Sequence, residues 1–142
     1  METYKKDFVG WAKVAKRIEA SNKPKTPKIG AIYWCNFGVG IGHELAGKDV
    51  DFSRPCLILA HYSNSLVLAI PLTSRKHTGS NYEPNIANGK TENLVLSQAR
   101  PLDIRRIGDF MDEIDKTALT ELRKRYLRFV KYQLYKKDDP SQ

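Results

Sequence analysis

Four side chains near the middle of the 142-residue chain are of the types that act on a phosphodiester. Glu44 and Arg54 border one loop, and Thr73 and Ser74 end an apolar stretch that follows it. A carboxylate accepts a proton, an arginine fork matches two phosphate oxygens, and hydroxyl groups donate hydrogen bonds to them. The pattern indicates a phosphodiester site. The alternative that these residues leave open is a plain ion pair between Glu44 and Arg54, worth about 0 to 1 kcal/mol.

The four side chains meet only if the stretches that carry them form a hairpin. Residues 55–63 and 65–74 are rich in β-forming apolar residues, and a few small polar residues separate them. In an antiparallel hairpin, the start of the first strand and the end of the second lie at the same end of the sheet. We therefore expect Arg54 and Thr73 to lie close together.

Two other chemistries have weaker support. The GVGIG segment at 38–42 is glycine-rich, but no helical pattern follows it, so a dinucleotide site is not expected. Neither the histidines nor the cysteines show metal-ligand spacing, so we expect no metal and no other cofactor. Without an export signal, the cysteines are expected to be buried thiols in a reducing cytoplasm. The residues concerned are His43, His61, His77, Cys35 and Cys56.

Short strands dominate the predicted elements around the site. The predicted strands are 29–37, 55–63, 65–74, 92–99 and, as a fifth, 102–110. Pro71 suggests that its strand is at an edge or carries a bulge, and the polar segment 75–91 reads as a mobile surface loop. Five short strands without intervening helices favour a small antiparallel barrel within a mainly β, α+β fold.

Helical periodicity marks both ends of the chain. Residues 7–20 form an amphipathic pattern with Asp7 as the N-cap, and a long helix is predicted from about Asp115. We predict three units: 1–27 as a helix with a Pro/Lys-rich linker, 28–137 as the barrel with its C-terminal helix, and 138–142 as a disordered tail.

The net charge of +8 lies in the two ends of the chain. Residues 1–28 hold eight Lys/Arg against three acids, and residues 121–142 hold seven against three. The charge is therefore poor support for nucleic-acid binding by the central fold. The N-terminal helix is expected to dock on the domain, with binding to nucleic acid or a membrane surface as alternatives. No apolar run approaches the roughly 20 residues that span a bilayer, so no membrane association is expected.

Four motifs occur in a characteristic order: KIGAIYWCNF at 28–37, GHELAGKDVDFSRPCLIL at 42–59, AIPLTS at 69–74 and LSQARPLD at 96–103. With these motifs, residues 28–130 resemble the MazF/PemK family, the toxins of bacterial type II toxin–antitoxin pairs. The resemblance implies an SH3-like antiparallel barrel of the MazF/CcdB type and a homodimer. It also implies a cytoplasmic protein that is neutralised by a cognate antitoxin, and sequence-specific cleavage of single-stranded RNA, including mRNA, without metal.

The resemblance also implies roles for individual residues. Arg54 matches the active-site arginine of the family, Thr73 matches its threonine, and Ser74 matches the hydroxyl residue beside it. Glu44 falls where some members place an acidic residue in the first loop, and Gln98 matches a common glutamine. Ser97 stands where several members have an aspartate, so the role of that acid is missing here.

Cleavage without metal uses the 2′-hydroxyl of the RNA and gives a 2′,3′-cyclic phosphate and a 5′-hydroxyl. On this hypothesis Glu44 is the base, and Arg54 stabilises the phosphorane, because a guanidinium holds its protons too strongly to act as an acid near neutral pH. Thr73 completes the catalytic set. His43 or a water is the proton donor, and the RNA-binding residues are His43, Ser74, Gln98 and Arg100. Two alternatives remain: a non-catalytic nucleic-acid- or gyrase-binding module on the same fold, and a structural or regulatory protein in which the basic N-terminal helix carries the function.

Overall fold

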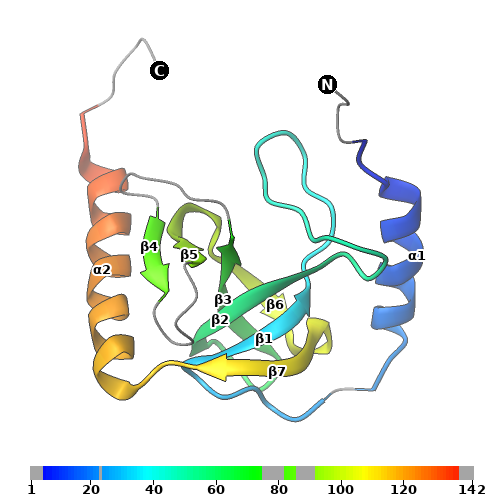
Figure 1. Cartoon of the computed structure of the whole chain (residues 1–142), viewed down its shortest axis with the longest axis horizontal. Coiled ribbons are helices and arrows are strands. Elements are labelled where there is room, and N and C mark those ends of the chain that lie inside the picture. The colour runs from blue at the N-terminus through cyan, green and yellow to red at the C-terminus, as the bar shows by residue number, and fades with distance from the viewer. Residues whose placement is uncertain (1–4, 23, 75–81, 86–91, 138–142) are drawn as a thin grey trace.

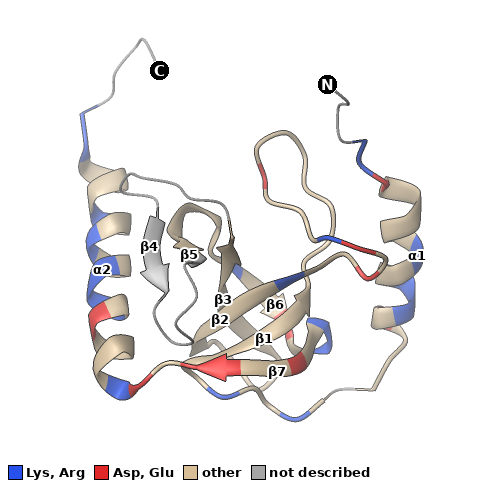
Figure 2. Ribbon diagram, in the orientation of Figure 1, with Lys and Arg blue, Asp and Glu red and all other residues tan. Residues whose placement is uncertain are grey.

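The computed structural model describes residues 5–22, 24–74, 82–85 and 92–137. An antiparallel sheet lies at the centre, with helix α1 (Phe8–Glu19) on one side and helix α2 (Lys116–Tyr135) on the other (Figure 1). Lys and Arg residues occur along both helices (Figure 2). Across these residues, no helix has the length and apolar character needed to span a membrane.

The sheet has the strand order β4-β5-β3-β2-β1-β7, and β6 pairs with β3 next to β5. All of its ladders are antiparallel. The mainly antiparallel α+β class is therefore as predicted. No ladder among the described residues joins β4 to β7, so the sheet is open rather than closed into a barrel. The strands are β1 (Ala31–Asn36), β2 (Ser53–His61), β3 (Leu66–Thr73), β4 (Tyr82–Asn85), β5 (Glu92–Val95), β6 (Arg100–Asp103) and β7 (Ile107–Glu113).

Both faces of the central strands are buried. In β2, Cys56 and Ile58 belong to one hydrophobic cluster, whereas Leu57 and Leu59 belong to another. Because side chains alternate along a strand, an unbroken apolar run such as that of β2 indicates burial on both sides. Helix α2 covers the second cluster through Leu122, which is why this helix carries an apolar stripe.

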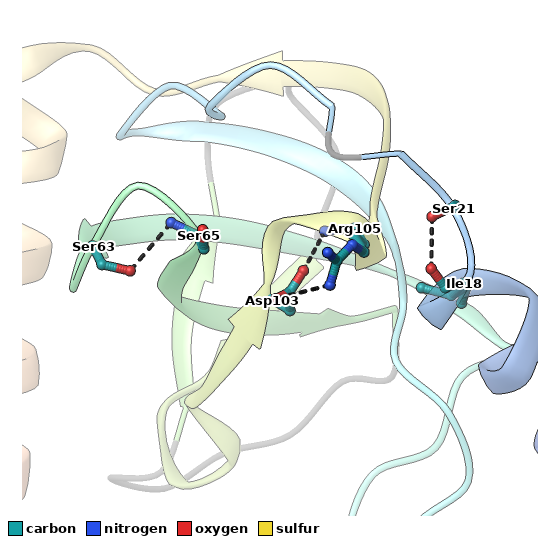
Figure 3. A network of polar contacts seen from close by, with 6 residues as sticks. All are labelled: Ile18, Ser21, Ser63, Ser65, Asp103 and Arg105. Atoms are coloured by element: carbon teal, nitrogen blue, oxygen red, sulfur yellow. Dashed lines mark hydrogen bonds and ion pairs between the residues drawn. The ribbon is translucent and has the colours of Figure 1, made fainter.

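The β2–β3 hairpin has the predicted arrangement. Its register pairs Cys56 with Pro71 and His61 with Val67. In the turn, the Ser63 hydroxyl accepts a hydrogen bond from the Ser65 amide at 3.1 Å (Figure 3). This side-chain contact supports a tight reversal of the chain, as serine does in many turns.

Pro71 lies neither in an edge strand nor at a register shift, contrary to the prediction. On the side away from β2, β3 pairs with β6 as far as Ala69 and with β5 from Leu72 onward. Pro71 occupies the gap between these two ladders, where a missing N–H removes no ladder hydrogen bond on that side.

Two other predicted segments need correction. The segment 75–91, predicted to be a loop, contains strand β4, and its remaining residues lie outside the described part of the chain. The strand predicted at 102–110 is interrupted by a 3₁₀ turn at Ile104–Arg106. The Asp103 carboxylate accepts the Arg105 amide N–H at 2.9 Å and lies 3.9 Å from its guanidinium (Figure 3), which stabilises this turn.

The predicted helices and buried thiols are present. Asp7 caps α1 by accepting the Gly10 amide, and Asp115 caps α2 by accepting the Ala118 amide. Cys35 and Cys56 are buried and form no disulfide. The predicted tail at 138–142 lies outside the described residues.

Candidate active site

Arg54 lies at the start of β2, and two backbone carbonyl groups from other segments orient its side chain. Its side chain is 9% exposed. Nε donates to the carbonyl oxygen of Ala46 at 2.9 Å, and Nη1 donates to that of Leu72 at 3.0 Å. The first acceptor lies in the β1–β2 loop and the second in β3, so two segments fix the guanidinium. Each carbonyl oxygen accepts one hydrogen bond from the guanidinium, so these two contacts fix its orientation.

The hairpin brings Thr73 and Ser74 to the same end of the sheet as Arg54. The contact between Arg54 and Leu72 crosses the β2–β3 hairpin one residue before Thr73. Thr73 is 7% exposed and is held on its other side by pairing with Asn93 in β5. Ser74 follows the strand and is exposed. One buried hydroxyl residue and one accessible hydroxyl residue thus lie close to the arginine.

A cleft of about 240 Å³ lies beside Arg54. A second cleft of about 400 Å³, lined in part by β7, adjoins it, because the two share part of their lining. The residues shared by both clefts are Trp34, Lys48, Asp49 and Ser53. Arg54, Pro55, Leu72 and Ser74 line the smaller cleft only, and Asn36, Asp51, Gly108 and Asp109 line the larger. Cations, carboxylates, hydroxyls and one indole therefore face a continuous groove.

Trp34, Lys48 and Asp49 were not identified from the sequence. Trp34 lies opposite Pro55 in the β1–β2 ladder, which places it next to Arg54. Lys48 and Asp49 belong to a tight turn in which Lys48 bridges to Ser53 and Asp49 adopts a φ of 64°. The available signal was the charged KDVD run just before Arg54. Its significance depends on a strand register that the sequence does not specify.

Glu44 and His43 lie near the tip of the same loop, and both are exposed. The Glu44 carboxylate accepts the Ile41 amide at 2.8 Å, and the Glu44 amide donates to the Ile41 carbonyl at 3.1 Å. Glu44 thus closes a turn of its own loop. It is not among the residues that line the two clefts beside Arg54.

Gln98 and Arg100 contact the loop from its other side. The Gln98 side chain accepts the Leu45 amide at 3.2 Å and donates to the His43 carbonyl at 3.4 Å. The Arg100 guanidinium lies 5.3 Å from the centre of the Phe37 ring, close enough for a cation–π interaction. Both side chains therefore support the loop conformation in addition to the RNA contacts predicted for them.

Arg106 is a further basic residue near Arg100. Arg106 donates to the carbonyl oxygens of Asn36 and Phe37 at 3.2 and 3.4 Å. Burial lowers the pKa of the Arg106 guanidinium, and the positive charge of Arg100 lowers it further. Within the described ranges, no group of three or more His, Cys, Asp or Glu side chains is arranged to hold a metal ion.

The fold is that of a small α+β protein, with an open antiparallel sheet and two helices. Its candidate site holds a buried arginine at the open end of the β2–β3 hairpin. Residues 28–130 match the sequence profile of the PemK-like, MazF-like toxins of type II toxin–antitoxin systems. The chain belongs to this family. No curated protein sequence matches it.

Solved structures of MazF proteins share the fold. The chain is 26% identical to MazF (Form-I) from Deinococcus radiodurans, with a TM-score of 0.63 over 76% of this chain and 99% of that one. A MazE–MazF complex (Form-II) from the same organism matches at 25% identity and a TM-score of 0.57, over 76% and 98% of the chains. A mycobacterial endoribonuclease in complex with its cognate antitoxin matches at 17% identity and 0.57, over 74% and 95%, which shows the fold alone.

Proposed function

We propose that this toxin is a metal-independent endoribonuclease that cleaves single-stranded RNA. The observation that carries the proposal is Arg54, a buried cation oriented by the Ala46 and Leu72 carbonyls beside a groove. An oriented guanidinium stabilises charge that develops on a phosphorane without reorganising during the reaction. Family membership and the endoribonuclease among the similar structures support the same activity.

In the proposed reaction the RNA supplies its own nucleophile. A base removes the proton of the 2′-hydroxyl, the 2′-oxygen bonds to phosphorus, and the bond between phosphorus and the 5′-oxygen breaks. The leaving 5′-oxygen takes up a proton, so the products are a 2′,3′-cyclic phosphate and a 5′-hydroxyl. Arg54 stabilises the phosphorane, and Thr73 and Ser74 donate hydrogen bonds to its oxygens.

Two carboxylates compete for the role of base. The resemblance indicates Glu44, whose carboxylate is held by the Ile41 amide at the loop tip. Asp49 lines both clefts and lies in the turn that leads into Arg54. If Asp49 is the base, Asp49→Asn should lower kcat by about 10²-fold or more, whereas Glu44→Gln should have a smaller effect. The opposite ranking would assign the reaction to Glu44.

The remaining predicted residues have secondary roles in this scheme. His43 supplies the proton or a phosphate contact, and Gln98 and Arg100 contact unstacked bases. The MazE–MazF complex and the mycobacterial complex support an antitoxin as protein partner. A homodimer is part of the same proposal, and sedimentation of the purified chain tests it.

The decisive experiment is incubation of the protein with a long mixed-sequence RNA in EDTA, beside Arg54→Gln. Arg123→Gln is a matched control, because it removes the same charge from an exposed position of α2. We expect discrete fragments with 5′-hydroxyl ends from the wild type and the control. Loss of one oriented donor lowers kcat by about 10²–10³, so Arg54→Gln should give almost none.

Two observations favour a second candidate function. The Glu44 carboxylate is committed to its own loop, and Ser97 replaces an acidic residue of the family pattern. Both fit a binding module for nucleic acid or gyrase that lacks catalysis. Intact RNA after treatment with folded wild-type protein, together with binding to gyrase or to duplex DNA, would establish this second function in place of the first.

A further inference from the structure

Helix α1 precedes the part of the chain that matches the toxin family, yet it contacts the loop that borders the candidate site. The family match begins at residue 28, whereas α1 spans Phe8–Glu19. The loop at 37–52 joins β1 to β2 and lies on the same side of the sheet as α1 (Figure 1). The contacts fall at three places: the tip of the loop, its base and the turn before β2.

Trp11 packs against the base of the loop. Its ring lies 5.8 Å from the ring of Phe52 in an edge-on arrangement. A Cβ atom added to Gly38 would lie 2.7 Å from the indole, so the helix and the loop backbone are in direct contact. The Arg106 guanidinium lies 5.4 Å from the indole centre, which encloses the ring between a cation and an aromatic side chain.

Lys6 holds the tip of the loop. Its ammonium group donates to the carbonyl oxygen of Gly40 at 2.7 Å and to that of Gly42 at 3.2 Å. A third contact, between Arg17 and Asp51 at 3.4 Å, is exposed and contributes little. Lys6, which precedes the N-cap Asp7, and Trp11, which lies within α1, therefore form the main connection between this N-terminal segment and the loop.

The loop transmits this connection to Arg54. The Gly47 amide donates to the Gly38 carbonyl at 2.6 Å. The outgoing part of the loop, which contacts Trp11, is therefore bonded to the part that returns to β2. The preceding residue, Ala46, supplies the carbonyl that orients Nε of Arg54. Displacement of Gly38 would consequently move an acceptor of the arginine.

We propose that α1 is a built-in brace, in which Lys6 and Trp11 are positioning residues that hold the loop at 37–52 in the conformation that orients Arg54. The effect on catalysis rests on the proposed ribonuclease function, whereas the effect on the loop does not. The brace gives a role to an amphipathic helix outside the family match, in which Val14 is buried and Trp11 packs on the loop.

Hydrogen exchange of the full-length protein tests the structural half of the proposal. In Trp11→Ala and Lys6→Ala, protection of the Glu44 and Gly47 amides should fall about tenfold, which corresponds to about 1.4 kcal/mol. Amides in the centre of β2 and β3 should be unchanged. The controls are Val9→Ala, an exposed apolar position of the same helix, and Lys13→Ala, which removes the same charge as Lys6→Ala.

Rescue variants separate positioning from general damage. Trp11→Phe retains a ring against Phe52, and Lys6→Arg retains a cationic donor, so both should recover most of the protection. Trp11→Ala could lower protection throughout the sheet by general destabilisation. In that case Lys6→Ala is the deciding variant, because Lys6 is part-buried and belongs to neither hydrophobic cluster. Unchanged loop protection in Lys6→Ala, or loss that the conservative variants do not restore, would overturn the brace.

RNA cleavage tests the functional half. The same variants should lower kcat several-fold and leave KM within about twofold, because the brace acts on the orientation of Arg54 and not on substrate contact. A loosened loop with unchanged kcat would refute the positioning role. An increase in KM with unchanged loop protection would instead indicate direct RNA binding by α1. If the wild type cleaves no RNA, the proposed function fails, and hydrogen exchange still decides whether the brace exists.

Discussion

Replacement of Arg54 by lysine separates the charge of this residue from its geometry. Lysine keeps the positive charge but has a single rotatable ammonium in place of a planar fork. The fork donates in two directions, through Nε to Ala46 and through Nη1 to Leu72, at 2.9 and 3.0 Å. One ammonium cannot reproduce both contacts in the same orientation. At least one carbonyl at the inner end of the groove therefore loses its partner.

The size of the effect follows from these contacts. A hydrogen bond from a charged donor contributes about 1.5–3 kcal/mol, and an orphaned buried acceptor costs about 1–3 kcal/mol. We expect the free energy of unfolding of Arg54→Lys to fall by about 1–3 kcal/mol. Loss of an oriented donor to the transition state costs about 2.7–4 kcal/mol, so kcat/KM for RNA should fall about 10²–10³-fold.

Urea unfolding and cleavage of a short oligoribonucleotide measure the two quantities on the same protein. Arg123→Lys on the exposed face of α2 makes the same chemical change outside the site and should alter neither quantity. A folded Arg54→Lys protein with the wild-type cleavage rate would show that charge alone suffices. It would refute the argument that the two carbonyls orient a catalytic fork.

Three further predictions concern stability. Leu122→Ala should lower the free energy of unfolding by about 2–5 kcal/mol in urea, because Leu122 joins α2 to the second hydrophobic cluster; a loss below about 1 kcal/mol would mean that α2 contributes little to the core. Gly38→Ala should cost about 1–3 kcal/mol, since Gly38 has a φ of +92° and the added methyl would contact the Trp11 indole; an unchanged urea midpoint would contradict the close contact of α1. Burial raises the pKa of the Cys56 thiol, so the unfolded chain loses this proton at a lower pH than the folded chain does. Stability should consequently fall as the pH rises above about 8.5, and urea midpoints at alkaline pH should decline less in Cys56→Ala than in the wild type.

Local sequence patterns predicted the elements whose contacts are close along the chain. The β2–β3 hairpin, both helices and the N-cap Asp7 follow from apolar runs, turn residues and a capping aspartate. Strand β4 was missed because Tyr82–Asn85 lies within a polar, turn-rich segment that has no apolar alternation. The break at Ile104–Arg106 was missed because isoleucine favours strands, whereas the Asp103 side chain stabilises a turn there.

The candidate site divides along the same line. Arg54 and Thr73 belong to one hairpin, so their proximity follows from the order of residues along the chain. Trp34 faces the cleft because β1 pairs with β2 in a particular register across a long loop, and no local pattern specifies that register. Asp49 is placed by a tight turn that the bridge between Lys48 and Ser53 closes. The sequence therefore failed to identify Trp34 because its position depends on long-range pairing.

This division has a functional consequence. The hairpin that holds Arg54 and Thr73 lies in a buried sheet, which fixes the half of the site that we propose to bind phosphate. Both carboxylates that could act as base, Glu44 and Asp49, lie on the β1–β2 loop, which is held by Gln98 from one side and by α1 from the other. Arg54 is held by the hairpin, whereas the carboxylate proposed as base is held by the loop. The position of the base can therefore differ between family members while the proposed phosphate contact of Arg54 is kept. On this argument, the loss of an aspartate at Ser97 is compatible with catalysis, provided that the loop is held in place.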